Sequence, residues 1–337
     1  MNEVRAGLDG AERLVDVFRG GLLECVHYGH AAISRVDGTL VESWGNPDST
    51  FLPRSASKML QALPLLESGA GADLEDTRLA LACASHSAER VHVERVGAWL
   101  DELELDEKAL ACGPQASRDA DLAEAMIREG EPVTRLCNWC SGKHAGFLTV
   151  AKHLGAGPDY VDPGHAVQVA VREAFEDMTG MVSPGFGIDG CSAPNFATTV
   201  RGMATAMARF AVAGKAGGVR DRSAARLRNA MIAHPDMVAG TGRADTVLMR
   251  ACREPVAIKS GAEGVHVAIL PSQSIGIAIK VSDGASRASE GALAALLVRL
   301  GVADATHPDV ARYLNMPVLN WDGLVTGSVR PVRDLLF

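Results

Sequence analysis

The sequence has 337 residues, of which 47% are hydrophobic, so it can bury the core of one large domain or two ordinary ones. Its 41 acidic and 33 basic residues give a formal net charge of −8, and no basic run of the kind that binds nucleic acid is present. No apolar run approaches the roughly 18 residues that span a bilayer, and residues 1–21 mix acids and bases, unlike a secretory signal. We therefore expect a soluble cytoplasmic protein with neither a nucleic-acid nor a membrane partner.

The N-terminal part of the chain predicts a pair of strands followed by helices. Residues 21–43 alternate in polarity around a turn dipeptide, Asp37-Gly38, and predict a two-stranded hairpin. The short polar break Ser85-His86-Ser87 separates two helical patterns. The helices predicted here cover residues 53–69, 76–86 and 92–106.

The middle of the chain predicts further helices around two glycine-containing stretches. Residues 137–146, CNWCSGKHAG, open a helical run, and residues 185–194, GFGIDGCSAP, predict a loop. Residues 195–214 predict an amphipathic helix, followed by a helical pair over 222–252. We assign three side chains of the amphipathic helix to the core: Met203, Met207 and Phe210.

The C-terminal third returns to β structure, with strands predicted at 256–261, 265–271 and 274–283 and a closing helix at 285–301. Strands at both ends with helices between them predict an α/β (α+β) fold: one antiparallel sheet with a large helical insertion. We expect a single domain over 1–337, with a sheet part at about 20–50 and 254–337 and a helical part at about 53–253. Because neither G-x-G-x-x-G nor a phosphate-binding P-loop occurs, no nucleotide is expected.

The seven scattered cysteines fit reduced thiols better than a disulfide framework, because their number is odd. Cys137 and Cys140 form C-x-x-C, yet no second pair has zinc-finger spacing, and no βαβ context suggests a redox motif. From spacing alone, buried thiols are favoured, and metal binding by some of the cysteines stays open.

Three short motifs point to nucleophilic catalysis. Ser55 and Lys58 are three residues apart, hence one turn apart on one helix face, where a neutral amine can take the proton of a hydroxyl. Alone, this pattern favours a capping serine beside an exposed lysine. Ser85 follows 30 residues later, and Lys259-Ser260-Gly261 ends a predicted strand. This order of motifs matches serine β-lactamases and penicillin-binding proteins and favours a serine acyl-transferase.

Five longer segments closely resemble the asparaginase II family of the Rhizobium etli type, and together they extend over nearly the whole chain. They are GNPDSTFLPRSASKMLQALPLLESGA, CASHSAERVHVERV, CNWCSGKHAGFL, GIDGCSAPNFA and MIAHPDMVAGTGRADTVLMRA. The resemblance implies a serine β-lactamase-like fold and a small-molecule substrate, L-asparagine, which is hydrolysed to L-aspartate and ammonia.

Carried over by motif, the resemblance also implies roles for individual residues. Ser55 is the expected nucleophile, Lys58 its activating base, Ser85 a second active-site serine and Lys259 the lysine of the C-terminal strand. A zinc ion is expected beside the pocket, on Cys140, Lys143 and Cys191. Trp139, just before Cys140, is bulkier than the residue that the family has at this position, so the resemblance does not predict the rim of the pocket.

Elementary chemistry adds expectations for substrate binding. Two lysines that converge on one site repel each other, so the pKa of at least one should fall and provide a neutral base. Arg243 could pair with the substrate α-carboxylate, and Asp189 could hold its α-ammonium group or orient Lys143. The backbone N–H groups of Ser55 and Ala262 are expected to hold the oxyanion.

Several alternatives stay open at this point. His86 and His144 adjoin motif residues, and a supporting or solvent-exposed role is favoured over catalysis. The chain could be another serine hydrolase on the same scaffold, acting on β-lactams, peptides or esters. It could also be a non-catalytic relative that binds an amino acid or a metal. We expect a homodimer.

Overall fold

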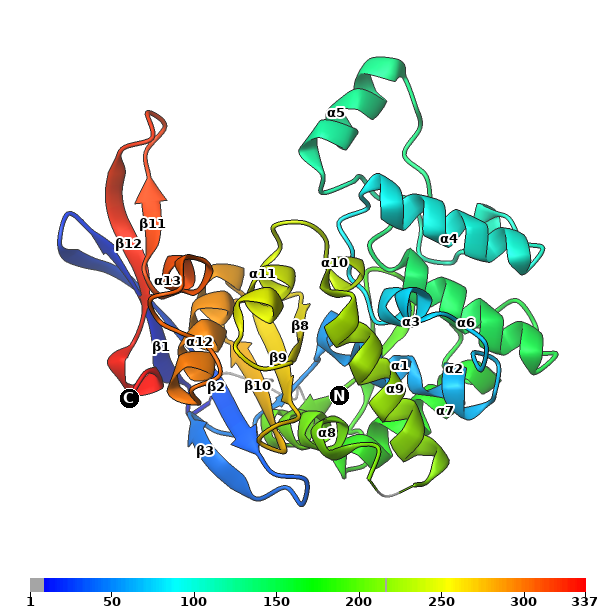
Figure 1. The fold of residues 1–337 in the computed structure, drawn as a ribbon, viewed down its shortest axis with the longest axis horizontal. Helices are drawn as coiled ribbons and strands as arrows, with labels where there is room; N and C mark the ends of the chain where they lie inside the picture. The colour runs from blue at the N-terminus through cyan, green and yellow to red at the C-terminus, as the bar shows by residue number, and fades with distance from the viewer. Residues whose placement is uncertain (1–8, 216) are drawn as a thin grey trace. The chain divides into compact units, whose positions relative to one another are not determined.

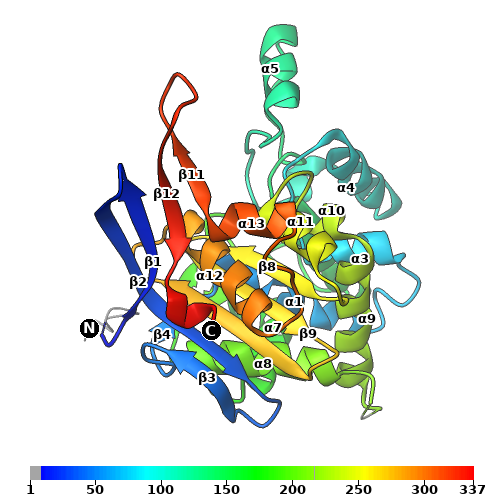
Figure 2. The same ribbon diagram turned by 60° about the vertical axis from the view of Figure 1, so that its left-hand side comes forward.

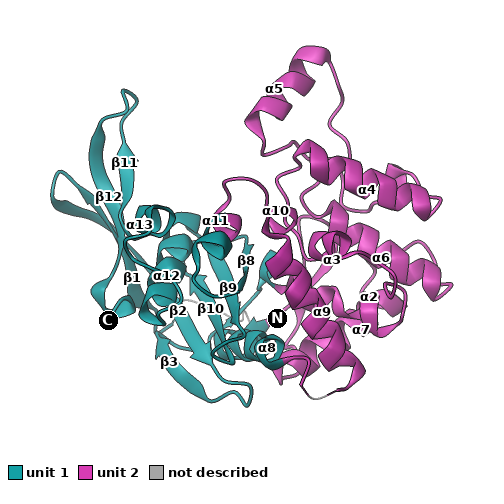
Figure 3. Cartoon of the chain, in the orientation of Figure 1, with its two compact units in different colours: residues 1–56, 198–212, 247–337 teal, residues 57–197, 213–246 magenta. Residues whose placement is uncertain are grey.

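A computed structural model describes residues 9–215 and 217–337 of the chain (Figure 1). The first part of the segment predicted not to be a secretory signal, residues 1–8, lies outside the described residues. The chain divides into two compact units, drawn in different colours in Figure 3. Unit 1 comprises the described residues of Met1–Ala56, Thr198–Val212 and Val247–Phe337, and unit 2 those of Ser57–Ala197 and Ala213–Thr246.

Unit 1 is built on one antiparallel sheet that combines strands from both ends of the chain, as the blue and the yellow-to-red arrows of Figure 1 show. The strand order is β11-β12-β1-β2-β10-β9-β8, and β3 pairs with β2. The predicted α/β class, with an antiparallel sheet from N- and C-terminal strands, is therefore confirmed. The strands are β1 (Glu12–Arg19), β2 (Leu22–Ser34), β3 (Leu40–Trp44), β8 (Ala257–Gly261), β9 (Val265–Leu270), β10 (Ile275–Val281), β11 (Met316–Leu319) and β12 (Val325–Pro331).

The sheet is larger than the sequence predicted. It begins at Glu12 rather than at about residue 20, because β1 pairs on one side with β2 and on the other with β12. The chain also does not close on the helix predicted over 285–301: β11 and β12 follow and form a further hairpin. In both Figure 1 and Figure 2 this hairpin reaches beyond the helices of unit 1.

The two longest helices of unit 1 pack against this sheet. Helix α8 (Val200–Val212) contacts β10, β2 and β9, and helix α12 (Ser286–Arg299) contacts β12, β9, β10 and β1. A Cβ at Gly276 in β10 would lie 2.3 Å from the Ala204 carbonyl oxygen, so glycine permits the close approach of α8. The predicted core residues of α8 are confirmed, since Met203, Met207 and Phe210 are fully buried. The remaining elements of unit 1 are short: β4 (Thr50–Phe51), β7 (Thr198–Thr199), α13 (Pro308–Leu314) and η3 (Arg333–Leu335).

Unit 2 is almost entirely helical. The stretch predicted as a glycine-rich loop contains a short hairpin, β5 (Phe186–Ile188) and β6 (Pro194–Phe196), with Asp189 and Cys191 in its turn. The helices are α1 (Lys58–Gln61), α2 (Leu63–Glu67), α3 (Asp76–Ala82), α4 (Arg90–Glu102), η2 (Glu107–Ala109), α5 (Ala120–Glu129), α6 (Ser141–His153), α7 (Ala166–Thr179), α9 (Val219–Ala233) and α10 (Pro235–Val238). Two elements straddle the unit boundaries: η1 (Arg54–Ser57) and α11 (Ala244–Ala251). Across residues 9–215 and 217–337, none of the helices is both long and apolar enough to traverse a bilayer.

Candidate functional site

Ser55 lies in η1, in the turn that leads into α1. The residue before it, Arg54, adopts a left-handed backbone conformation with φ of 52°, and the Ala56 N–H donates to the Pro53 carbonyl oxygen at 3.1 Å. Only glycine adopts such a φ without steric cost, so the turn at Ser55 is held under backbone strain. The Arg54 guanidinium also lies 3.9 Å from the Glu263 carboxylate of unit 1.

The end of β8 packs tightly against this turn. A Cβ at Gly261 would lie 2.6 Å from the Pro53 carbonyl oxygen and 3.1 Å from the Ala56 nitrogen. Lys259 lies two residues earlier in the same strand, so its side chain shares the face on which Gly261 meets the turn. The Lys259 side chain is fully buried, and its Nζ donates to the Ser260 carbonyl oxygen at 2.7 Å.

The other predicted catalytic residues lie in unit 2, where Lys58 and Ser85 contact each other directly. Lys58 Nζ donates to Ser85 Oγ at 2.9 Å and to Cys140 Sγ at 3.2 Å, and it also contacts the Ala84 carbonyl oxygen. Lys58 is only 1% exposed, so the interpretation as a solvated lysine is wrong. An amine surrounded by acceptors and held beside a hydroxyl is placed to move a proton to or from that hydroxyl.

Cys140, Lys143 and Cys191 form a buried cluster that adjoins Lys58. Lys143 Nζ donates to Cys191 Sγ at 3.0 Å. A hydrogen bond from Cys140 and the charge of Lys143 hold the pKa of Cys191 well below its usual range, against the opposing effect of burial. That same hydrogen bond, together with burial, raises the pKa of Cys140 to about 12. Although burial disfavours its charge, Lys143 has a pKa above the ordinary value, because Cys191 and Cys140 favour the ammonium form.

The contacts within this cluster centre on one thiol. The Cys191 sulfur receives hydrogen bonds from both Lys143 and Cys140. Zinc–ligand bonds of about 2.0–2.3 Å bring tetrahedral ligands to comparable separations. Within residues 9–215 and 217–337 no group of three or more His, Cys, Asp or Glu side chains is placed to hold a metal. The set therefore fits zinc only if Lys143 gives up its proton and becomes the third ligand.

Asp189 acts on this cluster through its charge, and His86 through a hydrogen bond to the helix of Lys143. Asp189 accepts the Gly190 N–H at 2.7 Å, and its charge adds to those that raise the pKa of Lys143. His86 Nδ1 accepts the Ala88 N–H at 3.1 Å, so its Nε2 is the nitrogen that donates to Ser141 Oγ, at 3.0 Å. Because Ser141 opens α6, this bond ties the Ser85 segment to the helix of Lys143. His86 and His144 are both fully buried, which excludes the solvent-exposed role considered for them.

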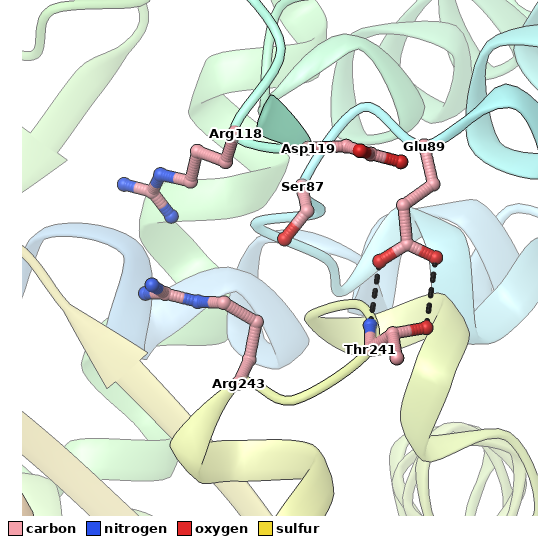
Figure 4. A pocket seen from close by; sticks show the side chains of 6 residues that line it. All are labelled: Ser87, Glu89, Arg118, Asp119, Thr241 and Arg243. Atoms are coloured by element: carbon pink, nitrogen blue, oxygen red, sulfur yellow. Dashed lines mark hydrogen bonds between the residues drawn. The ribbon is translucent and has the colours of Figure 1, made fainter. Parts of the chain in front are cut away.

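Arg243 lines a pocket of about 590 Å³ in unit 2, together with Arg118, Ser87, Glu89, Asp119 and Thr241 (Figure 4). Its loop is tied to the Ser85 segment, since Ser85 N–H donates to the Val238 carbonyl oxygen at 2.9 Å and Ser87 Oγ to that of Ala239 at 2.9 Å. These two bonds anchor the loop that leads to Arg243 beside the segment that carries Ser85.

Backbone strain marks the same loops. Among the described residues, six non-glycine residues have a positive φ, and four of them directly follow or precede a predicted motif residue. These four are Arg54 (φ 52°), Ala88 (φ 55°), Ser192 (φ 70°) and Glu263 (φ 60°). Strain of this kind gathers at functional sites. The predicted residues therefore fall into two sets: Ser55, Lys259 and Ala262 in unit 1, and Lys58, Ser85, Cys140, Lys143, Asp189, Cys191 and Arg243 in unit 2.

The sequence did not predict that Arg118 lines this pocket or that it stacks on Trp139. Arg118 was not singled out, because neither its spacing nor its neighbours distinguish it in the sequence. Trp139 was noted only for its bulk, and the structure gives that bulk a use: the Arg118 guanidinium carbon lies 3.2 Å from the centre of the Trp139 ring. In the sequence, Arg118 stands among small and polar residues, and no pattern marks it as a site residue. Only the fold places it over this ring.

Solved structures that resemble the chain are remote in sequence. A protein named Mglu, in its native form, aligns with 16% identity and a TM-score of 0.44 over 82% of this chain and 66% of its own, and its glutamate form aligns with 16% identity and a TM-score of 0.47 over 81% and 61%. A class C β-lactamase from Rhodobacter sphaeroides aligns with 17% identity and a TM-score of 0.40 over 77% and 92%. The chain thus spans about two thirds or less of the length of these Mglu chains.

Comparison with whole families gives a clearer result than comparison with single proteins. No curated protein was found to match the chain. A family model described as L-asparaginase II matches residues 15–331, which include every element that carries a candidate residue. The chain therefore belongs to the L-asparaginase II family.

Proposed function

We propose that this protein is an L-asparagine amidohydrolase that forms an acyl-enzyme on Ser55. Family membership supports a hydrolase of this kind. The single observation that carries the residue roles is the contact between buried Lys58 and half-buried Ser85, with Nζ 2.9 Å from Oγ. Lys58 lies three residues after Ser55 along the chain. An acid–base lysine, a relay hydroxyl and a nucleophile are then available from one short helical segment and one loop.

In the acylation step, Lys58 takes the proton from Ser55 Oγ, which attacks the side-chain amide carbonyl of the substrate. The backbone N–H groups of Ser55 and Ala262 hold the developing oxyanion. Lys58 then passes its proton through Ser85 to the amide nitrogen, the C–N bond breaks and ammonia leaves. Lys259 contributes a positive charge on the β8 face that meets the Ser55 turn.

In the deacylation step, water attacks the aspartyl ester on Ser55. Lys58 removes a proton from the water and returns it to Ser55 Oγ as the ester C–O bond breaks. The products are L-aspartate and the free enzyme. Asp189 would hold the substrate α-ammonium group or keep Lys143 in place, and Arg243 would bind the α-carboxylate.

We further propose that Cys140, Lys143 and Cys191 hold a zinc ion. The support is the contact of Lys143 and Cys140 with the Cys191 sulfur, and the low pKa of Cys191, which supplies a thiolate. Bound zinc would provide a fixed positive charge beside Lys58. Elemental analysis of protein never exposed to chelator should find one equivalent of zinc per chain, and markedly less in Cys191→Ser. Active protein that contains no metal would contradict the zinc proposal.

The test of the reaction is ammonia release from L-asparagine by wild type, Ser55→Ala and Ser68→Ala. Ser68 lies at the end of α2 and donates only to the Pro64 carbonyl oxygen among described side-chain contacts, so it controls for loss of a hydroxyl. We expect activity in wild type and Ser68→Ala and near-complete loss in Ser55→Ala. Quenched wild-type reactions should also carry an aspartyl group on the peptide that contains Ser55. Activity that survives in Ser55→Ala would remove Ser55 as the nucleophile.

The other serine-hydrolase chemistries are tested with the same proteins. Turnover of nitrocefin, with no ammonia release from L-asparagine, would favour a β-lactam substrate. Binding of L-asparagine or zinc without turnover would favour the non-catalytic alternative.

We also propose that the protein is cytoplasmic and forms a homodimer. Light scattering coupled to size-exclusion chromatography tests the assembly, because a chain of 35.4 kDa should elute at twice that mass if it dimerises. Elution at the mass of one chain over a wide concentration range would contradict it.

A further inference from the structure

The pocket of unit 2 brings two arginines to the same side. Figure 4 shows the guanidinium groups of Arg118 and Arg243 next to each other, across the pocket from Glu89. Burial, and after it the positive charge of Arg243, lower the pKa of Arg118 to about 10. Holding two cations together in a partly desolvated place costs free energy, which an anion between them would recover.

The acidic residues of the pocket do not neutralise this pair. Glu89 accepts from the backbone N–H and the hydroxyl of Thr241, at 2.5 and 3.1 Å, and Asp119 accepts the Leu122 N–H at 3.2 Å. Within residues 9–215 and 217–337, neither arginine side chain donates a hydrogen bond or forms a close ion pair, although the buried Asp245 favours the charge of Arg118. The donors of both guanidinium groups are therefore available to a ligand.

Arg118 is also held in a fixed orientation. Its guanidinium lies 3.2 Å above the Trp139 ring, and the indole N–H of Trp139 donates to the Ala116 carbonyl oxygen at 3.0 Å. The Arg118 backbone N–H donates to the Ser87 carbonyl oxygen at 2.8 Å. A stacked guanidinium presents its N–H groups at the edge of its plane, which suits bidentate binding of a carboxylate.

We propose that Arg118 and Arg243 form a two-arginine carboxylate site, with Trp139 as the platform for Arg118. This inference deepens the proposed function, on which its assignment to the substrate α-carboxylate rests. Ser87, which lines the same pocket, lies two residues after Ser85, and Trp139 directly precedes Cys140. It selects ligands that carry a free carboxylate and disfavours amidated or esterified analogues, in which that carboxylate is neutral.

The test uses succinate, a dicarboxylate that has no amide to hydrolyse, and its neutral diamide, succinamide. Binding is measured by calorimetry to wild type, Arg118→Gln and Arg243→Gln. Arg128→Gln is the matched control, because Arg128 on α5 is 74% exposed and its ion pair is with Glu124, at 4.0 Å on the same helix. We expect wild type to bind succinate but not succinamide. Each pocket variant should bind succinate at least tenfold more weakly, and Arg128→Gln as tightly as wild type.

Thermal stability separates a binding role from a structural one. Because the two cations repel each other, Arg118→Gln should melt at the same temperature as wild type or higher while it loses succinate. Arg118→Lys keeps the charge but loses the planar fork, so its affinity should fall between those of wild type and Arg118→Gln. The proposal would be overturned if folded Arg118→Gln or Arg118→Lys bound succinate as tightly as Arg128→Gln does.

Inhibition kinetics distinguish the source of the carboxylate. If wild type releases ammonia from L-asparagine, competitive inhibition by succinate places the substrate α-carboxylate in the site. Non-competitive inhibition assigns the site instead to a separate carboxylate ligand, and both patterns support the two-arginine site. If L-asparagine is not hydrolysed, the proposed function fails, yet succinate binding still tests the arginine pair.

Discussion

Lys58 is a buried lysine whose side-chain nitrogen contacts a hydroxyl, a thiol and backbone carbonyl oxygens. We predict that Lys58→Met lowers kcat by about 10²- to 10⁴-fold, the usual contribution of a general base. The unbranched methionine fills similar space, so the variant should stay folded. Steady-state ammonia release measures the effect, with Lys152→Met as the control, since that lysine is about half exposed on α6. Retention of a tenth or more of wild-type kcat in Lys58→Met would exclude Lys58 as the base.

Two buried histidines make stability depend on pH. Burial holds the pKa of His86 and of His144 well below the usual value. Between this depressed pKa and about 6.5, the unfolded chain binds protons that the folded chain does not. The free energy of unfolding should therefore fall as the pH drops below about 6.5, by up to about 1.4 kcal/mol per pH unit for each histidine.

Urea denaturation between about pH 8 and pH 5 checks this prediction. His86→Asn keeps a side chain that can accept and donate hydrogen bonds but does not titrate, so its stability should fall less steeply with acid than that of wild type. His153→Asn, at the exposed end of α6, should behave as wild type does. Equal slopes for wild type and His86→Asn would remove His86 as a source of acid sensitivity.

At single residues, sequence patterns singled out side chains that the structure places in contact, and the roles of these side chains stay predictions. Ser85 and Lys58 could be paired from motif order, and both cysteines of the cluster from the family segments. Arg118 could not, because its role arises from a stack on Trp139 and from a loop tied to the Ser87 carbonyl, which are contacts between residues far apart in sequence.

At the scale of elements, the fit between β8 and the Ser55 turn depends on one missing side chain. In Gly261→Ala the new Cβ would lie 2.6 Å from the Pro53 carbonyl oxygen, so the turn has to shift. We predict a loss of about 1–3 kcal/mol in stability, typical of overpacking, and about tenfold or more in kcat/KM, because small displacements of a nucleophile are costly. Gly157→Ala is the control, since nothing lies within 4 Å of its new Cβ. Wild-type kinetics in Gly261→Ala would show that the turn tolerates displacement.

Element prediction was accurate where apolar residues recur with a clear period. The three C-terminal strands and α8 were found in this way. By contrast, β1 carries charges at its start and end, and β11 and β12 contain Pro317 and Gly327, which weaken a strand pattern. These strands form because neighbouring strands supply hydrogen bonds, and a local pattern does not report its neighbours.

At the scale of the whole molecule, α8 is notable because it lies in the helical part of the sequence but packs on the sheet of unit 1. A fragment of residues 57–246 contains unit 2 and α8 but lacks β2, β9 and β10. We predict that Met207→Gln destabilises the full chain by about 1–3 kcal/mol, because it buries an amide without hydrogen-bond partners, yet increases the solubility of the fragment. Urea denaturation and the soluble fraction measure the two effects, and Arg209→Gln is the control on the same helix. Changes of the same sign in chain and fragment would contradict this assignment of α8.

The sequence predicted an antiparallel sheet with a helical insertion, and that arrangement is confirmed. It did not predict which helices join the sheet unit, because the apolar face of α8 shows that a partner exists without showing which one. The single domain over 1–337 stays a prediction.

The left-handed residues beside the motifs carry a consequence for protein engineering. A search for thermostable variants would favour glycine or asparagine at Arg54, Ala88, Ser192 and Glu263, since each left-handed L-residue costs about 1–2 kcal/mol. Those same four positions border Ser55, Ser87, Cys191 and Ala262. Heat resistance gained there would be traded against turnover, so stabilising libraries for this enzyme family are better directed at Glu104 and Ser274, the two strained positions away from the motifs.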